Sequence, residues 1–238
     1  MLKAFALFLL LVSAGVQAQP SLQTDLPLNY LVRADEQARN RPLVIFLHGS
    51  GSNEKDLLRL ADELPRHYNY LSVRAPKSME PGHYQWFAKK GEGAYDGDTS
   101  DLKASGQMLM EFIEKARAKY PTDAGNVYLV GFSQGAMMSY EIALRHPEAV
   151  GGIAAMGGRI LPVLRAELTP DEARRALAVF IGHGTADPII PFHDGTDADT
   201  FLKTLALEPE FHAYPGLGHE INAQEVKDLR AWLERLNP

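Results

Sequence analysis

The chain has 238 residues, with 24 Lys and Arg, 30 Asp and Glu, 45% hydrophobic residues and no Cys. Without cysteine it can form no disulfide, no zinc–thiolate or iron–sulfur site and no thiol nucleophile. The formal net charge of -6, with no run of Lys or Arg, argues against binding to nucleic acid or to anionic membrane surfaces. These totals fit a soluble globular protein of one large or two small domains.

Residues 1–18 have the pattern of an export signal. Lys3 gives a positive start, an apolar run follows, and Val16-Gln17-Ala18 resembles a small-x-small cleavage site. An uncleaved anchor is the alternative, but an apolar run of roughly 13 residues is shorter than the about 20 that span a bilayer. We therefore expect cleavage after Ala18, no stable membrane anchor, and a periplasmic or secreted mature chain.

Apolar runs alternate with amphipathic segments along the rest of the chain. The runs are mostly continuous, as in strands covered on both faces, and they occupy residues 28–33, 43–48, 70–73, 127–131, 150–156, 177–182 and 210–214. Helical spacing of apolar residues predicts helices over residues 54–64, 101–120, 134–145 and 223–236. Thr99 or Ser100 is the expected N-cap of the second helix, and residues 76–98 and 188–199 lack a clear pattern.

Repetition of strand and helix predicts an α/β fold with a mostly parallel central sheet and helices on both faces. No internal repeat and no linker divides residues 19–238. We therefore expect a single domain that leaves no room for a large lid.

The strongest local signal is Gly131-Phe132-Ser133-Gln134-Gly135, between a predicted strand and a predicted helix. A serine at such a turn needs a strained backbone, and small residues two positions before and after it relieve the crowding. The turn exposes the hydroxyl beside a helix N-terminus, where developing negative charge is stabilised. Ser133 is therefore a candidate nucleophile.

A serine hydroxyl needs a histidine base and a carboxylate that orients the base. Asp187 follows the predicted strand 177–182, and His219 follows the predicted strand 210–214, so both belong to the edge where the carboxyl ends of parallel strands lie. The chain order Ser133, Asp187, His219 is the one expected of an α/β-hydrolase.

Other acids and histidines fit these roles less well. His183 ends a buried strand and is expected to be a structural hydrogen-bonding residue, whereas His193 is too near Asp187 for another strand to separate them. The rival acids lie in an acidic loop and helix start: Asp194, Asp197 and Asp199.

Ester cleavage also requires donors for the oxyanion of the tetrahedral intermediate. The amide of Gln134, directly after the candidate nucleophile, is one expected donor. The other is expected from the small-residue loop His48-Gly49-Ser50-Gly51-Ser52, with the amide of Ser50 as our choice and His48 as a structural residue.

Together these motifs resemble the carboxylesterase/phospholipase family of α/β-hydrolases, which includes bacterial carboxylesterases and acyl-protein thioesterases. The resemblance covers nearly the whole chain from about residue 42 and includes further motifs: Leu47-His48-Gly49-Ser50-Gly51, Trp86-Phe87, His183-Gly184-Thr185-Ala186-Asp187-Pro188 and Gly216-Leu217-Gly218-His219-Glu220. It implies hydrolysis of carboxylic esters or thioesters through an acyl-serine intermediate, without metal or organic cofactor. It assigns Ser133 as nucleophile, Asp187 as orienting acid and His219 as base.

The resemblance also implies the residues that close the acyl pocket, and these are expected to bind substrate: Trp86, Phe87, Ile160, Leu161 and Leu164. The expected activity is a serine esterase on small carboxylic esters of short to medium acyl length, acting as a monomer or homodimer. Alternatives on the same residues are a lysophospholipase, a thioesterase or a polyester depolymerase. A non-enzymatic binding protein on this fold should have lost a catalytic residue or glycine, and none is missing.

Overall fold

A computed structural model describes residues 20–90 and 96–237. The predicted export signal, residues 1–18, lies outside the described residues. Within the described ranges no helix is long and apolar enough to cross a membrane.

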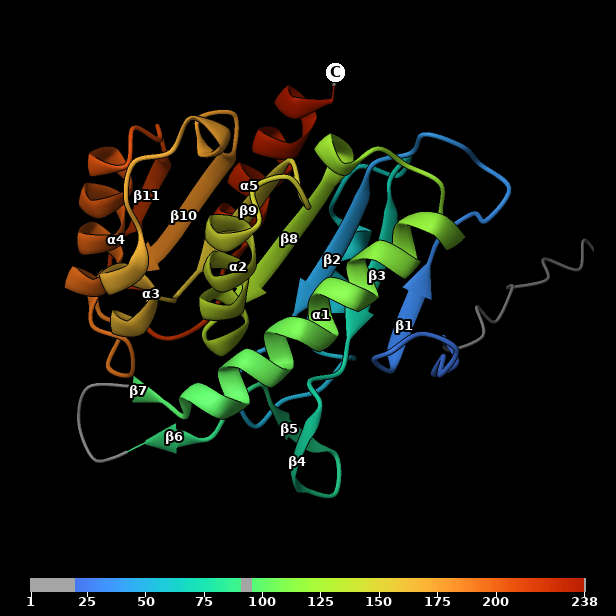
Figure 1. Cartoon of the computed structure of the whole chain (residues 1–238), viewed down its shortest axis with the longest axis horizontal. Helices are drawn as coiled ribbons and strands as arrows, with labels where there is room; N and C mark the ends of the chain where they lie inside the picture. Colours follow the sequence, from blue (N-terminus) through green and yellow to red (C-terminus); the bar gives the residue numbers. More distant parts are fainter. Residues whose placement is uncertain (1–19, 91–95, 238) are drawn as a thin grey trace, which may run out of the picture.

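The described residues build one seven-stranded sheet (Figure 1). In spatial order its strands are β1 (Tyr30–Arg33), β3 (Asn69–Val73), β2 (Leu43–Leu47), β8 (Val127–Phe132), β9 (Gly152–Met156), β10 (Ala178–Gly184) and β11 (Glu210–Tyr214). Only β1, at one edge, is antiparallel to its neighbour, and the other adjacent pairs are parallel. The sheet is thus mostly parallel, as predicted, and every predicted strand lies in it.

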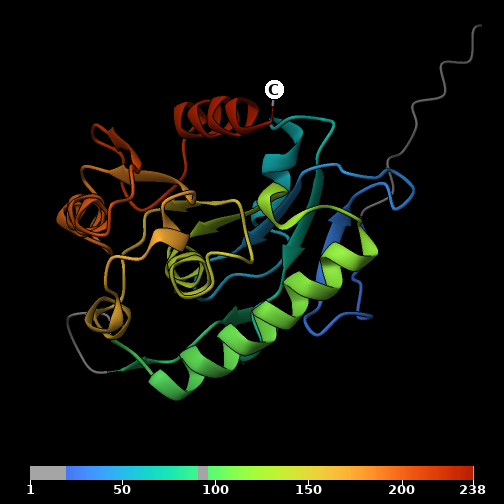
Figure 2. The same ribbon diagram turned by 45° about the horizontal axis from the view of Figure 1, so that its top comes forward.

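Helices cover both faces of the sheet (Figure 2). They are α1 (Thr99–Lys119), α2 (Gln134–Arg145), α3 (Pro162–Glu167), α4 (Phe192–Thr204) and α5 (Ala223–Leu236). α5 lies on one side of the sheet, whereas α1 and α2 lie on the other (Figure 2). Alternate residues of each central strand therefore enter different cores.

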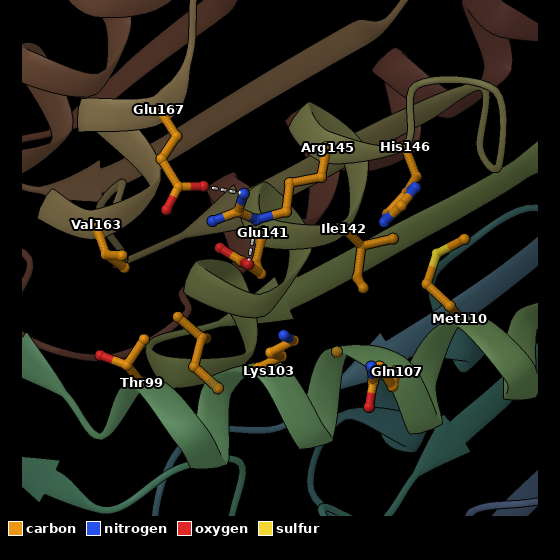
Figure 3. A pocket seen from close by; sticks show the side chains of 12 residues that line it. Thr99, Lys103, Gln107, Met110, Glu141, Ile142, Arg145, His146, Val163 and Glu167 are labelled. Atoms are coloured by element: carbon orange, nitrogen blue, oxygen red, sulfur yellow. Dashed lines mark hydrogen bonds and ion pairs between the residues drawn. The ribbon is translucent and has the colours of Figure 1, made fainter.

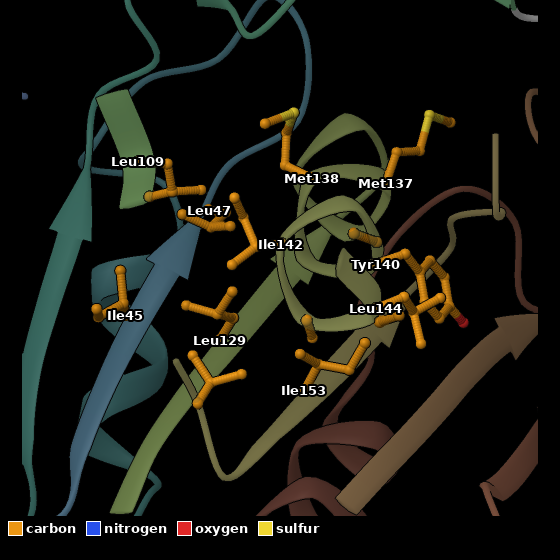
Figure 4. Packing of buried hydrophobic residues seen from close by; sticks show 14 of the residues in the cluster. Ile45, Leu47, Leu109, Leu129, Met137, Met138, Tyr140, Ile142, Leu144 and Ile153 are labelled. Atoms are coloured by element: carbon orange, nitrogen blue, oxygen red, sulfur yellow. The ribbon is translucent and has the colours of Figure 1, made fainter. Parts of the chain in front are cut away.

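The two cores divide the side chains of β2. Ile45 and Leu47 belong to the larger core with α1 and α2, which Figure 4 shows from close by. Val44 and Phe46 belong to the other core, with Leu229 of α5. This division explains why the central strands read as continuous apolar runs rather than alternating ones.

The prediction of a helix over 54–64 was wrong in extent, because only a short 3-10 helix, Leu57–Asp62, forms there. On the N-terminal side, the Lys55 amide donates to Asn53 Oδ1 at 3.0 Å, a local turn that competes with helix formation. On the C-terminal side, Pro65 disfavours helical backbone at the residue before it.

The cap of α1 also differs from the prediction. Its N-cap is Asp98, whose side chain accepts from the amides of Ser100 and Asp101, each at 3.0 Å. A carboxylate at this position accepts from these amides and also interacts favourably with the positive end of the helix dipole.

The two segments without a clear sequence pattern, residues 76–98 and 188–199, contain strands and part of a helix. Two antiparallel hairpins precede α1: β4 (Lys77–Glu80) with β5 (His83–Gln85), and β6 (Lys89–Lys90) with β7 (Asp96–Gly97). The segment 188–199 holds the start of α4, which buries Gly195, Ala198 and Leu202 against the rest of the protein. This buried stripe consists largely of small residues, so it lacked the apolar periodicity that predicts a helix.

Candidate active site

The candidate residues converge at the carboxyl ends of the central parallel strands. Leu47 at the end of β2 pairs with Gly131 of β8, and Phe132 at the end of β8 pairs with Met156 of β9. Gly184 at the end of β10 pairs with Tyr214 at the end of β11. The segments that follow these strands therefore meet at one edge of the sheet.

Ser133 lies between β8 and α2 in a strained conformation. Its φ is 54° and its ψ is -115°, and its amide donates to Met156 O at 2.9 Å. A non-glycine residue adopts positive φ only where the surrounding structure requires it, and such strain concentrates at functional turns. This turn places Ser133 at the entry of α2.

The two flanking glycines are required by close backbone packing. An ideal Cβ on Gly135 would lie 1.8 Å from Leu47 O, and one on Gly131 would lie 2.3 Å from Gly135 O. Neither position has room for a side chain, because the obstacles are backbone atoms. The turn can form only with glycine on both sides of it.

A continuous hydrogen-bonded chain joins the three predicted residues. His219 Nε2 lies 2.9 Å from Ser133 Oγ, and His219 Nδ1 lies 2.7 Å from Asp187 Oδ2. The Asp187 side chain is 1% exposed and that of His219 is 16% exposed. The imidazole thus connects a buried carboxylate to the hydroxyl, the arrangement that activates a serine.

Both oxygens of the Asp187 carboxylate have hydrogen-bond partners. Oδ1 accepts from the amides of Ile189 at 2.8 Å and Ile190 at 2.9 Å, which leaves Oδ2 for His219. The distance between Nε2 of buried His183 and Ile190 O is 2.9 Å. Because a carbonyl oxygen only accepts, Nε2 carries the hydrogen and donates it to the loop of Asp187. This is the structural role expected for His183.

The predicted oxyanion loop packs directly against Ser133. An ideal Cβ on Gly49 would lie 3.2 Å from Ser133 Cβ. Ser50 is exposed beside it, and the first hydrogen bond of α2 runs from Met137 N to Ser133 O at 3.2 Å, so Gln134 stands at the start of the helix. The loop and the helix entry therefore flank the serine, while the assignment of their amides as oxyanion donors stays a prediction.

His48 anchors the same loop in a defined tautomer. Its Nε2 accepts from the Ala75 amide at 3.0 Å, so its Nδ1 donates to Gly49 O at 2.7 Å. Burial lowers the pKa of the His48 imidazole, which favours this neutral form. His48 is thus structural, as the sequence indicated.

The five residues assigned to the acyl pocket are all buried. Their exposure is between 0% and 5%, and they belong to the larger core: Trp86, Phe87, Ile160, Leu161 and Leu164. In this conformation they do not line an open surface. Their contact with substrate stays a prediction.

Sequence reasoning missed several contacts and residues near the serine. The Gln134 side chain accepts from Trp86 N at 2.6 Å and donates to Phe87 O at 2.7 Å, so it holds the aromatic segment. Met79 and Ile189 are 53% and 63% exposed. Met79 Sδ lies 3.8 Å from Ser50 Oγ, and Ile189 follows Asp187 by two positions, so both apolar side chains belong to the rim of the site. The apolar run Pro188-Ile189-Ile190-Pro191, directly after the candidate acid, was the signal that could have found Ile189.

Known proteins resemble the chain over most of its length. The model of the phospholipase/carboxylesterase family matches residues 29–237. Acyl-protein thioesterase 1 of Mycosarcoma maydis is 38% identical over 222 residues, 82% of this chain and 91% of that protein. Putative hydrolase MhqD of Bacillus subtilis is 28% identical over 197 residues, 83% of this chain and 94% of that protein.

Among solved structures, the Bacillus cereus carboxylesterase matches with a TM-score of 0.75 at 25% identity, over 87% of this chain and 93% of that chain. These likenesses confirm the predicted α/β-hydrolase fold, without a large lid. Among residues 20–90 and 96–237 no group of three or more His, Asp or Glu side chains is placed to hold a metal ion. The chain therefore belongs to the phospholipase/carboxylesterase family, as its motifs predicted, and is a carboxylesterase-type serine hydrolase.

Proposed function

We propose that the chain hydrolyses carboxylic esters of short to medium acyl length through an acyl intermediate on Ser133. The observation that carries the proposal is the chain of hydrogen-bond distances from Ser133 Oγ to His219 Nε2, 2.9 Å, and from His219 Nδ1 to Asp187 Oδ2, 2.7 Å. With Nδ1–H donated to the carboxylate, Nε2 is free of hydrogen and can accept the hydroxyl proton.

In the first half of the reaction, Ser133 Oγ attacks the ester carbonyl carbon while His219 Nε2 takes the hydroxyl proton. The amides of Ser50 and Gln134 donate to the resulting oxyanion. Collapse of the tetrahedral intermediate breaks the bond to the alcohol oxygen, which receives the proton from His219. Water then attacks the acyl carbon while His219 Nε2 takes a proton from it, and collapse of the second tetrahedral intermediate breaks the bond to Ser133 Oγ, which takes that proton back as the carboxylic acid leaves.

The rim of the site supports an apolar acyl group of modest size. Met79 in β4, 3.8 Å from Ser50 Oγ through its Sδ, and Ile189, in the loop of Asp187, present exposed apolar surface. Transfer of acyl methylene groups from water to such surface is favourable. A thioester is the second candidate bond, because the Mycosarcoma maydis relative is named an acyl-protein thioesterase.

Hydrolysis of p-nitrophenyl acetate, butyrate and longer esters, compared with matched acyl thioesters, tests the proposal. Ser133→Ala is expected to lower kcat by about 10^6-fold, since the nucleophile is lost. Ser78→Ala, an exposed serine in β4, is the matched control and should keep wild-type activity. Rapid labelling by a fluorophosphonate that Ser133→Ala abolishes would support an activated serine, and wild-type hydrolysis by Ser133→Ala would refute it.

We further propose that residues 1–18 direct export and are removed. The support is the charged start, the short apolar run and the small residues before Gln19. Fractionation of bacterial cells expressing the full chain, followed by N-terminal sequencing, is expected to find Gln19 as the first residue of periplasmic or secreted protein. An intact N-terminus in the cytoplasmic fraction would contradict it.

A further inference from the structure

The hairpin of β4 and β5 pairs with the predicted oxyanion loop, residues 48–52. The amide of Gly51 donates to Tyr84 O at 2.8 Å, and the amide of Tyr84 donates to Ser52 O at 2.9 Å. These two hydrogen bonds make an isolated antiparallel bridge between Ser52 and Tyr84. Ser50, whose amide is the expected oxyanion donor, directly precedes Gly51. The backbone of Tyr84 therefore holds the loop beside that donor.

The loop has little stiffness of its own. Glycine leaves the backbone freer than any other residue, and Gly49 and Gly51 stand on either side of Ser50. Gly51 also adopts a φ of 79°, which few other residues adopt. An oxyanion donor stabilises the transition state only when it is held in place before the charge develops. The position of the Ser50 amide thus depends on contacts from outside the loop.

The side chain of Tyr84 is anchored by a buried ion pair. The guanidinium carbon of Arg74, the residue after β3, lies 4.6 Å from the centroid of the Tyr84 ring. The same guanidinium donates to both carboxylate oxygens of Glu54, from Nε at 2.7 Å and from Nη2 at 2.8 Å. Glu54 is 2% exposed and follows the oxyanion loop by two residues. Because a two-point pair fixes the plane of the guanidinium, its face is a rigid support for the ring.

We infer that Tyr84 is a positioning residue for ester hydrolysis: its ring, stacked on Arg74, fixes the backbone bridge that keeps the Ser50 amide in place. The inference rests on the proposed function and extends it by naming the residue that aligns one oxyanion donor. That donor acts chiefly on the charge of the transition state. Loss of the stack should therefore lower kcat and leave KM nearly unchanged.

Kinetics with p-nitrophenyl butyrate test the role of the ring. Tyr84→Leu keeps an apolar side chain without a ring, and we expect kcat to fall by about 10-fold to 100-fold with KM within about twofold. Tyr84→Phe keeps the ring face toward Arg74 and should retain the wild-type kcat. Phe201→Leu is the matched control, because it removes the ring of another guanidinium stack, with Arg165 at 4.7 Å, between α3 and α4. Its kcat should equal that of the wild type.

A second substitution tests whether the ring acts through the ion pair. Arg74→Lys keeps the positive charge but loses the planar two-point pair with Glu54, so kcat should fall by about 10-fold or more. The double variant with Tyr84→Leu should be no more than about threefold slower than the slower single variant, because both substitutions break the same link. Losses that multiply would overturn the coupling of the ring to Arg74.

Amide hydrogen exchange of peptides spanning residues 48–53 measures the hold on the loop without any activity. Exchange should be faster in Tyr84→Leu than in the wild type, and unchanged in Tyr84→Phe and Phe201→Leu. Far-UV circular dichroism reports that each variant is folded, and if Tyr84→Leu does not fold, Arg74→Lys decides. A wild type that cleaves no ester would refute the proposed function, and the exchange rates would then decide the inference alone.

Three results would overturn the inference in an active wild type. They are an unchanged kcat in Tyr84→Leu, an equal loss in Tyr84→Phe, and a loss that lies in KM rather than in kcat. Unchanged exchange of residues 48–53 in Tyr84→Leu would overturn it whether or not the wild type is active.

Discussion

Asp187 and Glu141 are both buried carboxylates, yet their surroundings differ. Asp187 has both oxygens engaged, Oδ1 by the amides of its own loop and Oδ2 by His219. Glu141 lines a cavity between α1, α2 and α3 and shares one oxygen with Arg145 (Figure 3). Its other oxygen finds no hydrogen-bond donor in the described part of the chain. A fully bonded carboxylate is held in one orientation, as a catalytic chain requires, whereas a buried acceptor without a donor costs stability.

Replacing each carboxylate by its amide gives the largest contrast. Asp187→Asn should lower kcat by about 10^4-fold, because an amide at this position favours the wrong tautomer of His219. Glu141→Gln should change kcat for p-nitrophenyl butyrate by less than about twofold, since it lies at the far end of α2.

Asp197→Asn, at an exposed position among the rival acids, controls for loss of an acidic side chain in this segment and should leave kcat unchanged. If Asp187→Asn cost less than about tenfold, the orienting role would move to another acid and the comparison would fail.

Alanine in place of a glycine should change the free energy of unfolding in opposite directions in the two regions. Gly135→Ala would place a Cβ 1.8 Å from Leu47 O, so we expect it to lower the free energy of unfolding by at least about 3 kcal/mol. Gly106→Ala has open space and should raise the free energy of unfolding by about 0.5–1 kcal/mol, since alanine is the better helix former. Urea unfolding of both variants measures the difference, and stabilisation by Gly135→Ala would contradict the close packing at the serine turn.

Glu225 is another buried carboxyl group, and its contribution to the free energy of unfolding is expected to depend on pH. Burial, followed by the negative charge of Asp228, raises the pKa of Glu225 from 4.5 to about 8. The protonated form is therefore the stable one in the folded protein, and its contribution to stability falls as pH rises from 4.5 through about 8.

Urea unfolding at pH 6 and pH 9 checks this effect. Glu225→Gln should be more stable than the wild type at pH 9 by about 1–3 kcal/mol, with the difference smaller at pH 6. An equal difference at the two pH values would show that the carboxyl does not titrate between them.

The smallest expected effect on activity concerns the exposed apolar side chains at the rim of the site, Met79 and Ile189. Ile189→Ser and Met79→Ser should each lower kcat/KM for p-nitrophenyl hexanoate by about threefold to tenfold and change that for acetate less, because the longer acyl chain loses apolar contact. Leu22→Ser, another exposed large apolar side chain, is the matched control. An equal loss of kcat/KM for the acetate and the hexanoate would show that these side chains do not contact the acyl chain.

Much of the fold followed from short-range patterns. Continuous apolar runs predicted the strands of the main sheet, and α2 and α5 have the predicted bounds, Gln134–Arg145 and Ala223–Leu236. The chain order Ser133, Asp187, His219 with glycines at the serine turn indicated the residues that the structure brings within hydrogen-bond distance. These features were readable because strand burial, helix periodicity and tight turns each impose a local choice of residue type.

Other features depend on contacts between distant segments and left no local pattern. α4 is held by a stripe of small residues against β10, where Gly195 meets His183. The cavity between α1, α2 and α3, and the Glu141 oxygen without a hydrogen-bond partner in the described part of the chain, depend on how these helices pack. The sequence by itself determined the sheet, the helices with apolar stripes and the order of the reactive residues, since each rests on neighbours in the chain. The tertiary structure alone decided which carboxylates are satisfied, because hydrogen-bond partners and empty space are set by how separate elements pack.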